Sequence, residues 1–122
     1  LQAALDTAAT LGVPSVVYVV DTAGVTKASG RQDHTPVSSV TFAESKAITA
    51  AAFGIPTDQL VAAVGDDGVM AASLMQDPRV ILLGGGVPLF IGSTLVGGIG
   101  VSGGTPEQDI EAANAGAAVL MS

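Results

Sequence analysis

The side chains best suited to chemistry in this sequence gather on one polar loop. Arg31, Asp33 and His34 lie within four residues of one another. A guanidinium can bind a carboxylate through two parallel hydrogen bonds. His34 is the single histidine, and imidazole is the side chain most often used for proton transfer and metal binding. His34 could therefore serve as a general acid or base, or as a ligand for a metal or a haem iron. The alternative is a surface loop held by an Arg31–Asp33 ion pair, with His34 in solvent.

Two charged residues interrupt a predicted helix over residues 37–53 whose other side chains are mostly small or apolar. Glu44 and Lys46 stand two positions apart, so they point to different faces of the helix and are not partners. Glu44 could line a cleft as a general base. We expect Lys46 to bind a ligand, or to reach backbone carbonyls or a carboxylate such as Asp21.

A glycine-rich turn precedes the last predicted helix. Ser102, Gly103 and Gly104 stand just before Thr105, where free backbone amides and the helix dipole favour an anion. A carboxylate or a haem propionate could bind there. Alternatively, Thr105 and Gln108 form a capping box that already satisfies these donors, and the glycines only permit a sharp turn.

A second glycine cluster, Gly84–Gly86, follows a short apolar run. Gly85 and Gly86 could let the backbone approach a ligand closely, or they could form a tight loop.

The hydrophobic pattern of the sequence predicts the helices and strands that must position these residues. Apolar spacing predicts a helix, and β-branched runs bounded by turn residues predict strands. The predicted helices cover 1–11, 37–53, 57–64, 69–75 and 105–121, and the predicted strands cover 15–20, 25–30, 80–83, 88–91 and 94–101. Five short antiparallel strands with packed helices make a single α+β domain over residues 1–122.

Charge and composition exclude some partners. The net charge is −7, and an acidic chain with four basic residues is poorly suited to nucleic acid. There is no cysteine, so no disulfide or thiolate site is available. Charged residues make up only 12% of the chain, which favours burial of part of the surface in a homo-oligomer.

Residues 80–105 carry no charge and are long enough to span a bilayer, but nine glycines and one proline interrupt the segment. Because glycine disfavours a helix, we expect buried strands and turns in place of a membrane span. No signal peptide is visible. A cytoplasmic protein is the favoured expectation, and a secreted one stays open because Leu1 already lies in a predicted helix.

Three blocks of sequence stand in an order that is typical of one protein family. The first is Val19-Val20-Asp21-x-x-Gly24, and the second joins Arg31-x-Asp33 to Lys46-Ala47-x-Thr49-Ala50. The third begins at Gly84-Gly85-Gly86-Val87-Pro88 and continues over residues 97–109 (GGIGVSGGTPEQD). Together the blocks resemble the GlcG/HbpS-like family, which is similar to the C-terminal domain of PduO-type proteins, and the resemblance covers nearly the whole chain.

This resemblance implies a profilin-like fold, with a five-stranded antiparallel sheet and helices on both faces, in a homo-oligomer. It also implies haem as the first candidate ligand, since some members bind haem. Our leading hypothesis is a domain that binds a small planar or carboxylate-bearing ligand beside Arg31 and His34. The rivals are a catabolic enzyme that uses His34 or Glu44 for proton transfer, and a structural oligomerisation module.

Overall fold

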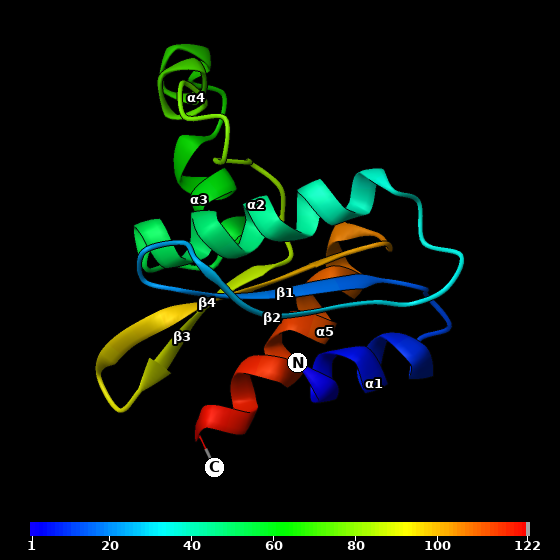
Figure 1. The fold of residues 1–122 in the computed structure, drawn as a ribbon. Coiled ribbons are helices and arrows are strands. Elements are labelled where there is room, and N and C mark those ends of the chain that lie inside the picture. The colour runs from blue at the N-terminus through cyan, green and yellow to red at the C-terminus, as the bar shows by residue number, and fades with distance from the viewer. Residues whose placement is uncertain (122) are drawn as a thin grey trace.

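The computed structural model of the chain describes residues 1–121. Figure 1 shows a sheet between two layers of helices, with a separate helical projection above. The helices are α1 (Gln2–Thr10), α2 (Ser38–Phe53), α3 (Thr57–Val64), α4 (Gly68–Leu74), α5 (Pro106–Ala118) and a terminal 3-10 turn η1 (Val119–Met121). The strands are β1 (Val16–Asp21), β2 (Thr26–Arg31), β3 (Gly86–Ile91) and β4 (Thr94–Ser102).

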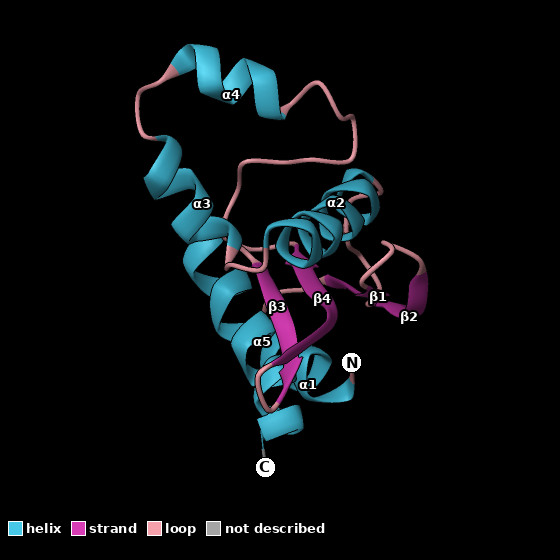
Figure 2. Ribbon diagram, turned by 90° about the vertical axis from the view of Figure 1, so that its left-hand side faces the viewer, coloured by secondary structure: helices cyan, strands magenta, loops and turns pink. Residues whose placement is uncertain are grey.

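The sheet is antiparallel, with strand order β2-β1-β4-β3. Helix α2 covers one face, and α1 and α5 lie together on the other (Figures 1 and 2). The α+β class and the helices on both faces are therefore confirmed.

The prediction of five strands is wrong, because residues 80–83 form no strand. The amide of Val80 donates to the carbonyl of Asp77 in a turn, and the amide of Ile81 donates to the Oγ1 of Thr49 on α2 at 3.0 Å. These donors therefore belong to a connecting segment beside α2. A short apolar run looks the same in sequence whether it packs as a strand or as an irregular segment.

Each face of the sheet has its own apolar core. Towards α1 and α5 the core contains Val17, Ile99 and Val101 from the strands, packed on small helical residues. Towards α2 it contains Val20, Ala47 and Ile48, with Tyr18 partly buried against them. The side chains of alternate residues in β1 and β4 thus point to opposite faces of the sheet, as they do in any β-strand.

Helix α2 lies exceptionally close to β4 because glycines face it. A Cβ on Gly98 would overlap the carbonyl oxygen of Ala47, and one on Gly100 would overlap the carbonyl oxygen of Ala43. Ala43 and Ala47 are themselves fully buried. The helix backbone therefore rests almost directly on the strand backbone.

Helices α3 and α4 form a projection that we call the arm. Figure 2 shows α4 farthest from the sheet, joined to β3 by a long returning loop. Among residues 1–121 no single helix is long and apolar enough to cross a membrane, whereas α2 and α3 together reach that length and composition but meet at a 72° bend.

We predict that Gly100→Ala lowers the free energy of unfolding by about 3 kcal/mol, because its methyl group must push α2 away from β4. Gly68→Ala is the matched control: its Cβ would have no neighbour within 4 Å, and alanine suits a helix better than glycine. Urea denaturation followed by circular dichroism measures both. Equal stabilities for the two variants would contradict the close contact.

Candidate functional site

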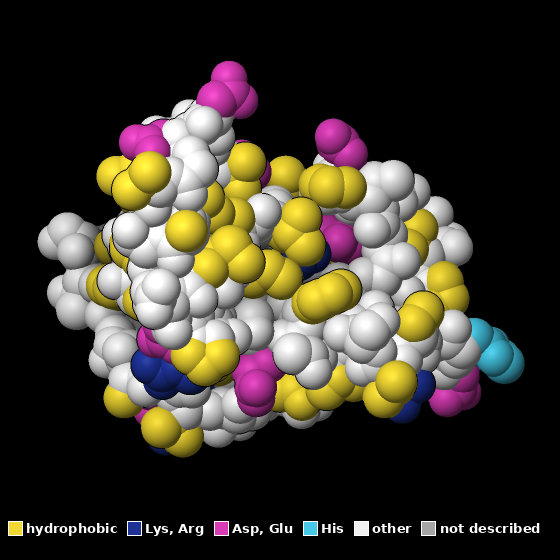
Figure 3. Space-filling model, turned by 90° about the horizontal axis from the view of Figure 1, so that it is seen from above, with side chains coloured by type: hydrophobic (Ala, Val, Ile, Leu, Met, Phe, Trp, Pro, Cys, Tyr) yellow, Lys and Arg dark blue, Asp and Glu magenta, His cyan; other side chains and the backbone are white. Residues whose placement is uncertain are grey.

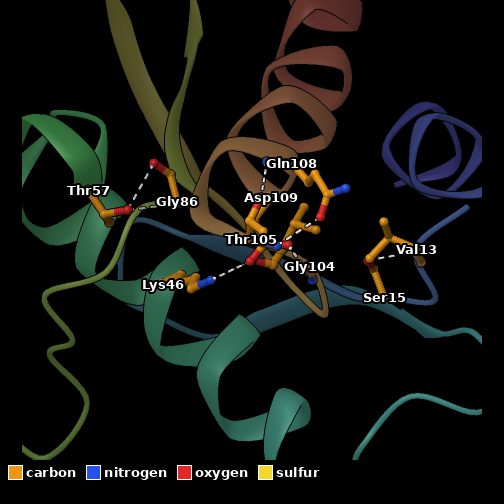
Figure 4. Close-up of polar contacts among 10 residues, drawn as sticks. Val13, Ser15, Lys46, Thr57, Gly86, Gly104, Thr105, Gln108 and Asp109 are labelled. Carbon is orange, nitrogen blue, oxygen red and sulfur yellow. Dashed lines mark hydrogen bonds and ion pairs between the residues drawn. The ribbon is translucent and has the colours of Figure 1, made fainter. Parts of the chain in front are cut away.

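A buried ion pair connects the two helical layers through the sheet (Figure 4). The Nζ of Lys46 on α2 lies 3.0 Å from the Oδ2 of Asp109 on α5, and both side chains are only 4% exposed. The same Nζ donates to the carbonyl of Val101 on β4 at 2.9 Å. The other carboxylate oxygen, Oδ1, accepts from the amide of Gly104 at 3.0 Å. The sequence interpretation that Lys46 reaches a carbonyl and a carboxylate is confirmed, with Asp109 in place of Asp21 as the carboxylate.

Asp21 is instead part of the β1–β2 turn. Its Oδ1 accepts from the amides of Ala23 and Val25, and its Oδ2 lies 3.5 Å from the Nζ of Lys27. The hydrogen bond from the Val25 amide, followed by the bond from Ala23 and the charge of Lys27, lowers the pKa of Asp21 below its usual value. The carboxylate therefore stabilises the turn in its ionised form.

Two predicted ligand-binding glycines lie against the buried pair. Gly85 has φ +122°, and a Cβ there would stand 3.0 Å from the Nζ of Lys46 and 2.9 Å from the Cβ of Asp109. The amide of Gly86 donates to the Oγ1 of Thr57 at 2.9 Å (Figure 4). Both residues are buried, so close packing accounts for both glycines.

The predicted anion site at the start of α5 has its amides already bonded. Thr105 and Gln108 form the predicted capping box, with the Oγ1 of Thr105 accepting from the Gln108 amide at 3.3 Å and the Gln108 Oε1 accepting from the Thr105 amide at 2.9 Å. The amide of Gly104 is held by Asp109. Ser102 is buried, and a Cβ on Gly103 would overlap the carbonyl oxygen of Pro14. An anion would have to displace the bonds of Gly104 and Thr105, so anion binding here stays a prediction.

The Arg31–His34 loop is exposed but well held. The Nη2 of Arg31 donates to the carbonyl of Thr35 at 2.6 Å, and the buried Thr35 hydroxyl donates to the carbonyl of Gln32 at 2.6 Å. Among residues 1–121 no ion pair joins Arg31 to Asp33. His34 is exposed and has φ 70°, a conformation that few residue types other than glycine adopt. Figure 3 shows the single histidine projecting from the surface.

Glu44 is half-buried on α2 and lies 3.5 Å from the hydroxyl of Thr26 on β2. Within the described part of the chain no hydrogen bond joins it to His34, and no three acidic or histidine side chains gather into a metal site. Proton transfer by Glu44 or His34, and metal binding by His34, therefore stay predictions.

Sequence reasoning missed a cavity of about 500 Å³ between β3 and the end of α5. Its walls are mostly apolar, with one amide side chain, and comprise Val87, Pro88, Phe90, Gly92, Asn114, Ala117, Ala118 and Leu120. The small side chains Ala117 and Ala118 leave this space open. These two neighbouring alanines near the end of the last predicted helix were the sign of the cavity in the sequence. The cavity itself exists only because the fold brings β3 opposite to them.

The cavity and the Arg31–His34 loop stand at opposite ends of the sheet. On β4, Leu95 pairs with the cavity residue Phe90, while Ser102 pairs with Val16, whose other neighbour is Arg31. Leu95 and Ser102 are seven residues apart, which is about 23 Å along a strand, and Ile99, the partner of the cavity residue Val87, is about 10 Å from Ser102. The cavity and the loop also lie at opposite edges of the sheet, on β3 and after β2. The chain therefore offers two separate places for a ligand: an apolar one, and one with a guanidinium and an imidazole.

Residues 1–118 match the protein family described as "Haem degrading protein HbpS-like". The chain is 35% identical over 121 residues to the corrinoid adenosyltransferase PduO of Citrobacter freundii, an alignment that covers 98% of this chain and 36% of that protein. The chain thus spans only part of that relative's length.

Two solved structures are similar over nearly the whole chain. The PduOC:Heme complex is 33% identical with a TM-score of 0.86, covering 96% of this chain and 86% of that one. The structure of HbpS is 36% identical with a TM-score of 0.88, covering 98% of this chain and 82% of that one.

We predict that Lys46→Met or Asp109→Asn alone destabilises the fold by about 3–5 kcal/mol, because each leaves a buried charge without its partner. In the double variant the loss should be clearly smaller than the sum of the two single losses. Lys27→Met, in the exposed pair with Asp21, is the control and should change stability little. Thermal and urea unfolding of the parent and the four variants measure these differences, and simple additivity of the two single losses would contradict direct coupling.

Proposed function

Since the chain belongs to the HbpS-like family of haem-degrading proteins, we propose that it is a haem-binding domain that works as a homo-oligomer. The observation that supports this proposal most strongly is the similarity over 96% of the chain to a domain crystallised with haem. No part of the proposal depends on the adenosyltransferase activity of the longer relative.

We propose the cavity between β3 and α5 as the place of the macrocycle. Its volume of about 500 Å³ lies within the range typical of small-molecule sites. The apolar walls suit the faces of a porphyrin and exclude water from them. Asn114 is the one side chain in the lining that can both donate and accept hydrogen bonds.

The lining fits the ring but supplies neither an axial imidazole nor a cation for the propionates. Haem brings redox-active iron to a site, and this chain's contribution there is binding, orientation and exclusion of solvent. His34 and Arg31 offer the missing groups, but they lie at the opposite edge of the sheet of their own subunit, displaced by about 10 to 23 Å along the strands from the cavity lining of β3. We therefore propose that the Arg31–His34 loop provides the imidazole and the guanidinium to a haem that lies in the cavity of a neighbouring subunit.

The cavity is tested by filling it. We predict that Ala118→Trp raises the dissociation constant for haem roughly tenfold or more, because the indole occupies space that the ring needs. Ala118 lies on the exposed rim, so the larger side chain does not overpack the core. Ala9→Trp, on the exposed face of α1, is the matched control and should bind haem as the parent does. Titration followed by the Soret absorbance measures all three, and equal affinities would remove the cavity from the proposal.

The role of the His34 imidazole is tested with a variant that can keep the positive φ of this position. We predict that His34→Asn shifts the Soret band and weakens haem binding, since asparagine tolerates the positive φ of this position but is a poor iron ligand. An unchanged spectrum and affinity would exclude His34 as the ligand.

Mixing the two variants distinguishes ligation between subunits from ligation within one. A mixed oligomer of Ala118→Trp and His34→Asn subunits contains intact cavities beside intact imidazoles from their neighbours. We expect co-refolded mixtures to regain part of the parent spectrum. If mixtures bind no better than the average of the separate variants, the loop does not act across subunits.

A further inference from the structure

The cavity between β3 and α5 has one polar end and one apolar end. Among the described residues that line it, Asn114 on α5 carries the only polar side chain, and Leu120 on η1 lies near the end of the lining. The two residues are six positions apart, which is about 10 Å along the helix axis. A ligand that spans this distance meets an amide at one end and an apolar side chain at the other.

The side-chain amide of Asn114 is available to a ligand. It has no hydrogen-bond partner in the part of the chain that the structure describes, and it is exposed at the rim of the cavity. Its Nδ2 can donate to a carboxylate oxygen, and such a bond is stronger than one to a neutral oxygen. Glu111, the nearest charged residue along α5, lies outside the lining and would repel a carboxylate. Asn114 is therefore the one side chain of the lining that attracts a carboxylate.

The opposite end adjoins a second, smaller cavity of about 150 Å³. No polar side chain lines this space, whose walls are Leu1, Val19, Leu89, Ile99, Gly116, Val119 and Leu120. Leu120 lines both cavities. Its side chain can therefore move into the small cavity when a ligand occupies the large one, without overpacking the core.

The haem molecule is divided in the same way. Two propionates extend from one half of the macrocycle, and two vinyl groups extend from the other half. A carboxylate is costly to remove from water, whereas an apolar group is stabilised by burial. The placement that satisfies both halves has the propionates at the exposed amide and the vinyl groups at the apolar end.

We propose that the cavity holds haem in one orientation, with a propionate hydrogen-bonded to Asn114 and the vinyl half of the ring against Leu120. The inference rests on the haem binding proposed above and names the two residues that determine how the ring lies. A few well-placed polar groups commonly fix the orientation of a ligand in an apolar site. In this orientation the propionates stay at the rim, in contact with water.

The first test combines a change in the protein with a change in the ligand. Asn114→Leu removes the amide, and haem dimethyl ester lacks the two negative charges of haem. We expect Asn114→Leu to raise the dissociation constant roughly tenfold for haem and by no more than about twofold for the ester, which accepts only a weaker hydrogen bond. Asn114→Gln keeps an amide and should recover part of the loss. Titration followed by the Soret absorbance measures all of these constants.

The second test examines the apolar end with deuterohaem, in which hydrogen replaces both vinyl groups. Leu120→Ala shortens a side chain that is 40% exposed, so the fold should tolerate it. We expect this variant to bind haem about fourfold more weakly than the parent does, because the vinyl groups lose an apolar contact. Its affinity for deuterohaem should stay close to that of the parent.

Each variant is the matched control for the other. Asn114→Leu should leave the preference for haem over deuterohaem unchanged, and Leu120→Ala should leave the preference for haem over its ester unchanged. If the two dependences are exchanged, so that Leu120→Ala alters the ester preference and Asn114→Leu the vinyl preference, the ring lies the other way round and the proposal is wrong.

The outcomes separate this inference from the proposal on which it rests. A parent protein that binds no haem, or an Ala118→Trp variant that binds it equally well, defeats the haem cavity and the orientation together. If Ala118→Trp weakens binding while both preferences stay at the parent value in Asn114→Leu and Leu120→Ala, only the orientation is overturned. Selective loss of the ester preference in one variant and of the vinyl preference in the other supports it.

Discussion

The contact between α2 and the glycines of β4 is the constraint on which the rest of the structure depends. Because Gly98 and Gly100 have no side chain, the helix backbone meets the strand backbone. That closeness lets the Lys46 ammonium reach Val101 on β4 and Asp109 on α5, and it brings Gly85 beside the same cluster. The buried pair then fixes α5 through its first turn, where Asp109 also holds the amide of Gly104. A charge buried so deeply is costly unless it is paired, so these elements hold one another in place.

This arrangement closes one end of the sheet and leaves the other end open. Near Ser102 the strand ends are occupied by the turn into α5 and by the held Arg31–Thr35 loop. Near Phe90 the hairpin of β3 and β4 stands beside the end of α5, where small side chains leave the cavity. A ligand that needs apolar walls and a ligand that needs a cation therefore meet different ends of one subunit. In the proposed homo-oligomer, the loop end of one subunit would meet the cavity end of a neighbouring subunit.

Much of this could be predicted from the sequence. The capping box at Thr105 and Gln108 is a local signal, and it is present in the structure as predicted. The family resemblance drawn from the glycine blocks is confirmed by the match over residues 1–118. The rest depends on contacts between distant residues. The partner of Lys46 is 63 positions away in the sequence. The amide of Val80 donates to Asp77 in a turn and the amide of Ile81 donates to Thr49 on α2, so neither is free to pair in the sheet. The alanines of α5 that line the cavity are visible in the sequence, but they leave a space only because the fold brings β3 opposite to them.

The central claim is that haem lies between β3 and α5. Hydrogen–deuterium exchange measured with and without haem tests it most directly, because it reports where the ligand lies in the unmodified protein. The account predicts slower exchange over residues 87–92 and 114–120, the segments that line the cavity. Protection that is confined to residues 31–35, or absent while haem is bound, would contradict it.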